Sequence, residues 1–305
     1  MSNRISLLVT IDVECDHSVR YRRRDPRAFS SVTSGIPDLL RPIWNTYGVR
    51  PIYFVSPEVV TDNPSAETLR REVEAGAILG THLHSELVEP NASASRIPEF
   101  PCSANPPEIL HQKLVTLTGM IEEHLGCRPE WYRAGRFGVD LDTIRSLATL
   151  GYRYDSSVTP MLDWTAYGGP DHSAAPVQPY WISADNLYSP ASPGDSLGVI
   201  EVPVTVGGKR WGLLGKLLPN HWFFNLWLRP THVTAAEQKR LIREWSEQYE
   251  NPTLVIFFHS YEVMVRTSPY VWGPRMQRSF LNRITEVLEN VHSYAEVSYE
   301  IGPVQ

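Results

Sequence analysis

The sequence contains few cysteines, no long apolar run and no extended basic block. Its three cysteines cannot all pair within one chain and form no Cys-x-x-Cys motif, which argues against a disulfide framework and against a zinc or redox site of that type. No uninterrupted apolar run reaches the ~18 residues that a membrane-spanning helix needs. The longest basic run is Arg22-Arg23-Arg24 and the formal charge is −6, so we expect no nucleic-acid partner.

The N-terminal apolar stretch, residues 5–11, is short, and no small-residue cleavage site follows it. A secretory signal peptide has an apolar region of about 7–15 residues that is followed by a cleavage site of small residues. Together with the cysteine usage, this predicts a cytoplasmic protein, either free or peripheral to a membrane.

Strand-like apolar runs alternate with segments of helical period along nearly the whole chain, which is typical of a parallel sheet in an α/β fold. Gly48, Gly76, Gly126 and Gly151 stand where a left-handed residue can end a helix. We therefore predict one α/β barrel domain over residues 1–305, because such barrels commonly exceed 250 residues. The expected strands are 5–11, 51–55, 77–83, 130–133, 152–155, 199–204 and 253–258, and the expected helices are 36–47, 66–75, 108–125, 141–150, 235–249 and 276–290.

Two segments interrupt this alternation, 160–198 and 207–230, and we interpret both as insertions above one face of the sheet. The second combines aromatic with cationic residues, which allows two interpretations. It could be a lid that packs on the barrel, or residues 211–228 could touch a membrane or a lipid-linked substrate. Its aromatic residues are Trp211, Trp222, Phe223, Phe224 and Trp227, and its cations are Lys209, Arg210, Lys216 and Arg229.

Polar pairs follow two of the expected strands. Asp12 and Glu14 stand at the end of the first strand, and His82 and His84 at the end of the third. The two-residue period of a strand places the members of each pair on one side. Active sites of α/β barrels form at the carboxyl ends of their strands. Two histidines and one carboxylate are a ligand set of catalytic zinc and of non-haem iron(II), although each pair alone could be a surface cluster.

Three further strands also end in polar residues. Arg133 and Arg136 lie in the segment Trp-Tyr-Arg-Ala-Gly-Arg-Phe-Gly, where they could orient a carboxylate or merely belong to a structural turn. Asp155 and His259 follow two other strands. A histidine after four apolar residues is often a core residue, but here it would join several polar groups on one rim.

In order, the segments TIDVE, GTHLH, YRAGRFG, YDSS and FFHS resemble the five motifs of the polysaccharide deacetylase family, also called the NodB homology domain or carbohydrate esterase family 4. The resemblance covers about residues 4–262. It implies a distorted (β/α) barrel of about seven parallel strands, with the insertions above its C-terminal face. It also implies a metal-dependent hydrolase that removes an N-acyl group, usually acetyl, from an amino sugar in a glycan or glycan precursor.

The resemblance also implies a role for each motif residue. Asp12 would be the general base, held and polarised by Arg133, and His259 would be the general acid, tuned by Asp155. A divalent metal, most commonly zinc, would activate water and polarise the acyl carbonyl. The oxyanion would lie on the metal and near the backbone N–H of Gly135. The metal ligands would be Glu14, His82 and His84.

The chain departs from the family pattern at two motifs. The family commonly has adjacent acidic residues and His-x-x-x-His, whereas this chain has Asp-x-Glu and His-x-His. Glu86 stands where the second histidine is common, so it could replace His84 as a ligand. Three alternatives stay open: a deformylase or other amide hydrolase acting on a lipid-linked amino sugar or a small cyclic amide, a catalytically inactive glycan-binding barrel, and a hydrolase that uses Cys15.

Overall fold

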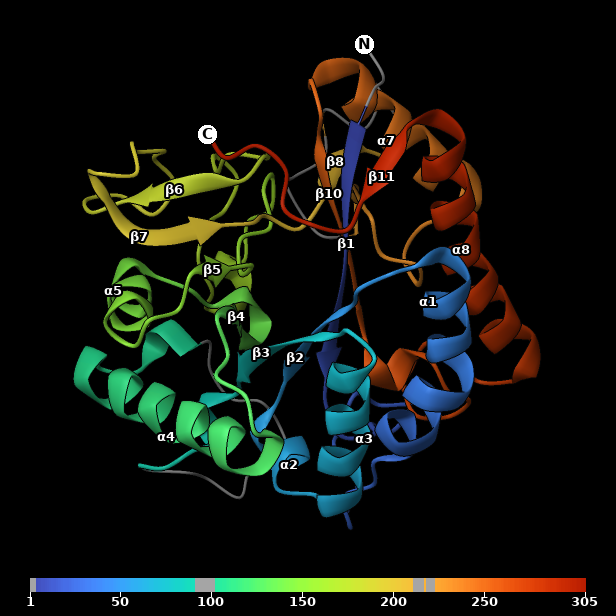
Figure 1. The fold of residues 1–305 in the computed structure, drawn as a ribbon, viewed down its shortest axis with the longest axis horizontal. Coiled ribbons are helices and arrows are strands. Elements are labelled where there is room, and N and C mark those ends of the chain that lie inside the picture. Colours follow the sequence, from blue (N-terminus) through green and yellow to red (C-terminus); the bar gives the residue numbers. More distant parts are fainter. Residues whose placement is uncertain (1–3, 91–101, 211–216, 218–222) are drawn as a thin grey trace.

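The main sheet of the fold is curled and carries helices on its outer side, seen in a computed structural model that describes residues 4–90, 102–210, 217 and 223–305 (Figure 1). Seven neighbouring strands run parallel, which confirms the distorted barrel that the motifs implied. In sheet order they are β10 (Thr253–His259), β1 (Arg4–Val13), β2 (Ile52–Val55), β3 (Ile78–Leu83), β4 (Trp131–Ala134), β5 (Tyr154–Asp155) and β7 (Ser196–Glu201).

The helices between these strands lie on the outside of the sheet (Figure 1). The Asp62 and Asp140 side chains accept hydrogen bonds from the first-turn N–H groups of Ser65 and Thr143, and so fix two helix starts. Gly48 and Gly126 end two helices in the left-handed conformation, as predicted. The helices are α1 (Arg41–Tyr47), which continues a π-helix (Ser31–Leu40), α2 (Pro57–Val60), α3 (Asn63–Glu74), α4 (Pro107–Leu125), α5 (Leu141–Thr149), α7 (Ala235–Gln248) and α8 (Pro274–Tyr294).

Both insertions contain strands that the sequence patterns did not predict. In the first, β6 (Tyr180–Ser183) pairs antiparallel with β7 and ends the sheet. In the second, β8 (Val206–Lys209) pairs antiparallel with β9 (Asn225–Trp227). Predictions about Trp211, Lys216 and Trp222 fall outside the described residues. A further short strand, β11 (Glu296–Ser298), pairs with the start of β1.

The edge of β10 that faces away from β1 pairs with no strand of the described residues and is covered by irregular backbone instead. The N–H of Val255 donates to Oγ1 of Thr205 across 2.7 Å, and the N–H of Phe257 donates to the carbonyl of Leu228 across 3.1 Å. These bonds satisfy groups that an open edge would leave unpaired. The inserted segment thereby becomes part of the barrel wall beside His259, the last residue of β10.

Strand register brings the polar strand ends together. Asp12 of β1 lies opposite His259 of β10, and His82 of β3 lies opposite Arg133 of β4. Because all four strands are parallel, their carboxyl ends meet at one end of the barrel. None of the helices in the described part of the chain is long and apolar enough to cross a membrane.

Candidate active site

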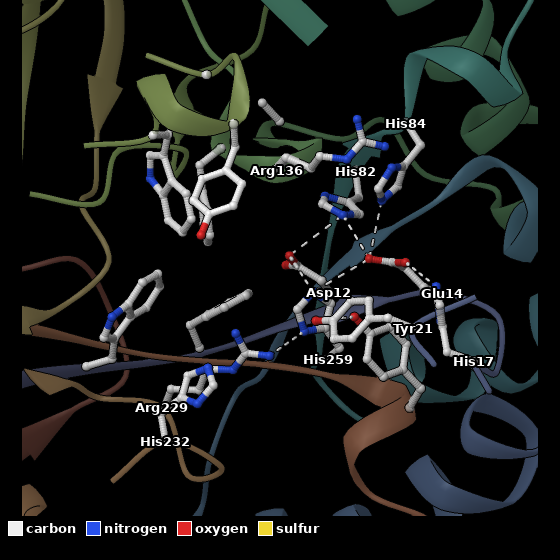
Figure 2. A pocket seen from close by; sticks show the side chains of 18 of the residues that line it. Asp12, Glu14, His17, Tyr21, His82, His84, Arg136, Arg229, His232 and His259 are labelled. Carbon is white, nitrogen blue, oxygen red and sulfur yellow. Dashed lines mark hydrogen bonds and ion pairs between the residues drawn. The ribbon is translucent and has the colours of Figure 1, made fainter. Parts of the chain in front are cut away.

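Glu14, His82 and His84 converge on one buried point at the carboxyl ends of β1 and β3 (Figure 2). Nε2 of each histidine lies 3.3 Å from Oε1 of Glu14, and the two rings stand nearly perpendicular, with centroids 4.7 Å apart. One ligand atom from each residue fits within a set whose members lie no more than 4.8 Å apart. The period-two spacing of both pairs therefore produces the shared face that the sequence predicted.

The protonation pattern of this cluster fits a metal ion. Nδ1 of His82 lies 3.0 Å from the backbone carbonyl of Arg133, so Nδ1 carries the proton and Nε2 presents a lone pair to Glu14. Nε2 of His84 is buried and has no hydrogen-bond partner among the described residues. Burial lowers the pKa of His84, but Glu14 and Glu86 outweigh it and raise this pKa to about 9, so the site favours a positive charge, which a bound divalent cation would supply in place of the proton. Glu14, His82 and His84 thus form a suitable donor set for a divalent metal.

Glu86 lies behind His84 instead of beside the other ligands. Its Oε1 is 3.5 Å from Nδ1 of His84, 2.9 Å from Nη2 of Arg23 and 3.2 Å from Nη2 of Arg136. Burial raises the pKa of Glu86, but His84 and the two arginines outweigh it and hold this pKa well below its usual value. A carboxylate on the outer nitrogen of a ligand histidine orients the ring. The geometry therefore favours His84, and not Glu86, as the third ligand.

A glycine allows this arrangement at the turn after β4. A Cβ on Gly135 would lie 2.7 Å from the carbonyl oxygen of Leu83 and 3.1 Å from Nδ1 of His84. The two residues that follow, Arg136 and Phe137, both have positive φ, at 55° and 56°. Such backbone strain costs about 1–3 kcal/mol per residue and often occurs at functional sites. Both side chains line the cavity above the cluster.

Asp12 is oriented by the fully buried Arg133. Nη1 of Arg133 donates to Oδ1 of Asp12 across 2.8 Å, which leaves Oδ2 facing the cluster, 3.7 Å from Nε2 of His82. The rest of the guanidinium donates to Thr10 and Ser156. The rings of Phe54 and Phe257 lie 4.3 Å and 5.2 Å from its central carbon.

His259 faces the same cluster from β10. Its Nε2 is 3.7 Å from Oε1 of Glu14 and 4.0 Å from Oδ2 of Asp12. The other ring nitrogen, Nδ1, lies 2.7 Å from Oε1 of Glu262, and the ring stacks on Tyr261 with centroids 4.6 Å apart. Sequence reasoning missed Glu262, although its place three residues after His259 has the spacing of a capping pair.

The expectation that Asp155 tunes His259 is wrong. Asp155 ends β5, which four strands separate from β10 in the sheet, and Glu262 already occupies Nδ1 of the ring. Asp155 instead accepts a hydrogen bond from Ser157 and lies opposite Glu201 of β7. Asp155 and Glu201 are both fully buried and so form an acid pair, and burial raises the pKa of Asp155 to about 6.

Two further buried residues, His17 and Cys15, lie near Glu14. His17 is buried, with Nδ1 3.0 Å from the carbonyl of Cys15 and Nε2 3.9 Å from Oε2 of Glu14. Burial lowers the pKa of His17, so its neutral ring presents Nε2 to the cavity. Cys15 is itself buried, and burial raises the pKa of its thiol, which is the opposite of what a nucleophilic cysteine needs.

A cavity of about 470 Å³ opens above the cluster, with an apolar wall on one side and the polar groups on the other (Figure 2). Phe137 anchors the wall, with its ring centroid 5.9 Å from Trp164, 6.0 Å from Trp227 and 5.2 Å from Phe257. The indole N–H of Trp164 donates to Oγ1 of Thr159 across 2.8 Å, which fixes the orientation of the ring. Both insertions line this cavity, the first through Trp164, Tyr167 and Gly169 and the second through Trp227 and Arg229, followed by His232 just after it.

Comparison with known proteins gives a result at the level of fold. No family profile and no curated protein matches the sequence. A structure from Pseudomonas aeruginosa PAO1, named a probable polysaccharide deacetylase, has a TM-score of 0.58 at 15% identity, over 98% of this chain and 88% of that one. One from Mycobacterium smegmatis, named a putative polysaccharide deacetylase, gives a TM-score of 0.52 at 17% identity, over 94% of this chain and 85% of that one. A Puue allantoinase gives 0.57 at 11% identity, over 98% and 88%.

The chain therefore has the fold of the polysaccharide deacetylases over nearly its whole length. The allantoinase shares this fold, so the fold alone does not identify the substrate.

Proposed function

We propose that this protein is a metal-dependent hydrolase that removes an N-acyl group, usually acetyl, from an amino sugar. The observation that carries the proposal is the convergence of three functions within one cavity. Glu14, His82 and His84 supply metal ligands, Asp12 supplies a base held by Arg133, and His259 faces both from the opposite strand. Structural neighbours named as polysaccharide deacetylases support the same chemistry.

The positions of these residues give each a step. A bound divalent metal, zinc in this proposal, supplies the positive charge that acidifies water and polarises the acyl carbonyl. Asp12 takes a proton from the attacking water through Oδ2, because Arg133 holds the other oxygen. His259 donates a proton from Nε2 to the departing sugar nitrogen as the C–N bond breaks. The aromatic wall that includes Phe137 and Trp164 then offers an apolar surface to the face of the sugar ring.

The second candidate is hydrolysis of a small cyclic amide, which the allantoinase of the same fold favours. A lipid-linked substrate has less support from the described part of the second insertion. Leu226, Trp227 and Leu228 are buried, and Trp227 belongs to the cavity wall, although Phe223 is half exposed. A cytoplasmic location stays a prediction from the sequence.

A substrate panel separates these candidates. Zinc- or cobalt-loaded protein is incubated with N-acetylated sugars, N-formylated sugars and allantoin, and release of amine or opening of the ring is followed. We expect amine release from an N-acetylated amino sugar and none from the Asp12→Asn variant, which should keep its metal. Loaded protein that is inert toward every acylated sugar would contradict the proposal, and activity toward allantoin alone would favour the second candidate.

A further inference from the structure

The imidazole of His259 is held on one edge and on a face by residues that no sequence motif pointed to. Oε1 of Glu262 lies 2.7 Å from Nδ1 and also accepts the backbone N–H of His259 across 3.2 Å. Tyr261 stacks on the ring at an interplanar angle of 16°. Oε2 of Glu262 accepts from the hydroxyl of Thr231 across 2.6 Å. The ring therefore has one fixed orientation, with Nε2 toward the metal ligands.

Arg229, which belongs to the second insertion, contacts the Glu262 side chain that holds His259. Its guanidinium forms an ion pair with Glu262 and lies against the rings of Phe257 and Tyr270, with its central carbon 4.9 Å and 5.4 Å from their centroids. Arg229 follows β9 and lines the cavity. The insertion therefore supports the catalytic end of β10 directly, in addition to covering the barrel.

Charge and geometry together decide which nitrogen of His259 carries the proton when the ring is neutral. Nη2 of Arg229 lies 3.2 Å from Nδ1, but a guanidinium can only donate. Burial raises the pKa of Glu262, yet Arg229 and His259 outweigh it and keep the pKa well below its usual value, so Glu262 is an ionised acceptor. A carboxylate at 2.7 Å requires a proton on Nδ1, and the contact to Arg229 is then a close approach without a hydrogen bond.

We propose that Glu262, held by Arg229, is the positioning residue of His259 and fixes its Nδ1–H, so that Nε2 is the atom that delivers a proton to the leaving nitrogen. The inference rests on the proposed function for the identity of the reaction. In the step itself the C–N bond breaks, its electron pair stays on nitrogen, and that nitrogen takes the proton from Nε2. Nδ1–H stays bonded to Glu262 throughout and stabilises the charged ring before the transfer.

The first test compares two leaving groups in the zinc-loaded Glu262→Gln variant. An amide needs a proton on its departing amine, whereas 4-nitrophenyl acetate releases an anion that needs none. We expect kcat on an N-acetylated sugar to fall at least about tenfold, with KM little changed, while the rate on the aryl ester changes less than about threefold. An equal fall on both substrates with zinc retained, or no fall on either, would overturn the proposal.

Glu72→Gln is the matched control. Glu72 is likewise a buried carboxylate paired with an arginine, because Nε of Arg41 donates to its Oε1 across 3.1 Å, but it lies on α3 and does not line the cavity. This variant should leave both rates unchanged. A matching loss in both variants would mean that any broken buried ion pair lowers the amide rate, and would equally overturn the proposal.

The second test uses the wild-type chain and needs neither a stable variant nor any turnover. Long-range ¹H–¹⁵N correlation spectra of the zinc-loaded protein, taken at alkaline pH and assigned with His259→Gln, report the tautomer of the neutral ring. We expect the Nδ1–H form. The Nε2–H form would overturn the proposal even if the enzyme is active. Protein that hydrolyses no acylated sugar but shows Nδ1–H would contradict the proposed function and leave the positioning role intact.

Discussion

Nη1 of Arg133 donates a hydrogen bond to Oδ1 of Asp12 across 2.8 Å, and both side chains are buried. The pair joins the carboxyl end of β4 to the carboxyl end of β1. The arginine thereby fixes Oδ1 of Asp12, and Oδ2 stays available to accept a proton.

Arg133→Met tests the contribution of this pair to stability. Removing one partner of a buried ion pair leaves an uncompensated charge, so we expect the free energy of unfolding at pH 7 to fall by about 3–5 kcal/mol. Chemical denaturation measures this change. Arg153→Met removes an exposed pair with Glu130 and should cost less than about 1 kcal/mol. Equal losses in the two variants would contradict the role of Arg133.

The third metal ligand can be identified by zinc binding. We expect His84→Ala to lose stoichiometric zinc at micromolar protein, because it deletes a donor nitrogen. Glu86→Gln should keep one zinc per chain with an affinity lowered about 10–100-fold, as for loss of a residue that orients a ligand. Equilibrium dialysis with metal analysis measures both. Full binding by His84→Ala together with none by Glu86→Gln would assign the site to Glu86.

The fold and the centre of the site could be predicted from sequence because they depend on local patterns. Apolar runs mark the strands, and their parallel arrangement places every strand end on one rim. Asp12, Arg133 and His82 follow from that rule, and the two-residue period adds Glu14 and His84.

The partner of His259 could not be predicted in the same way. It depends on where an irregular insertion places Arg229 and on a short turn after β10, neither of which has a sequence period. The family pattern pointed to Asp155 instead, but the curled sheet places that residue beside Glu201. Strands β6, β8 and β9 were missed for a related reason, since they are short and lie in Pro- and Gly-rich segments.

The buried acids Asp155 and Glu201 predict a pH-dependent stability. Burial raises the pKa of Asp155 to about 6, and burial together with Asp155 raises the pKa of Glu201 well above its usual value. The folded state therefore binds protons more tightly than the unfolded chain, whose carboxyls titrate near 4. The contribution of this pair to the free energy of unfolding is fully present below about pH 4 and is lost as the pH rises through 6 and beyond.

Glu201→Gln removes the charge that this pair cannot accommodate. We expect the Tm of the variant relative to wild type to increase between pH 5 and pH 8, measured by calorimetry in matched buffers. An unchanged difference across that range would show that the two carboxyls do not compete for a proton.

Cys15→Ser addresses the nucleophilic alternative. The thiol is buried and its pKa is raised, so the variant should retain turnover within about twofold of wild type. Amine release from the best sugar substrate is the measurement. Loss of turnover in a folded, zinc-loaded Cys15→Ser protein would support a mechanism in which Cys15 is the nucleophile.

The central claim is that Glu14, His82 and His84 hold one metal ion that serves amide hydrolysis. Zinc titration of metal-depleted protein, with bound metal and amine release from an N-acetylated sugar followed together, tests it most directly. We predict that activity rises in proportion to bound zinc and levels off at one ion per chain, and that His82→Ala gives neither binding nor activity. Undiminished activity in the metal-depleted protein, or in His82→Ala, would contradict the claim.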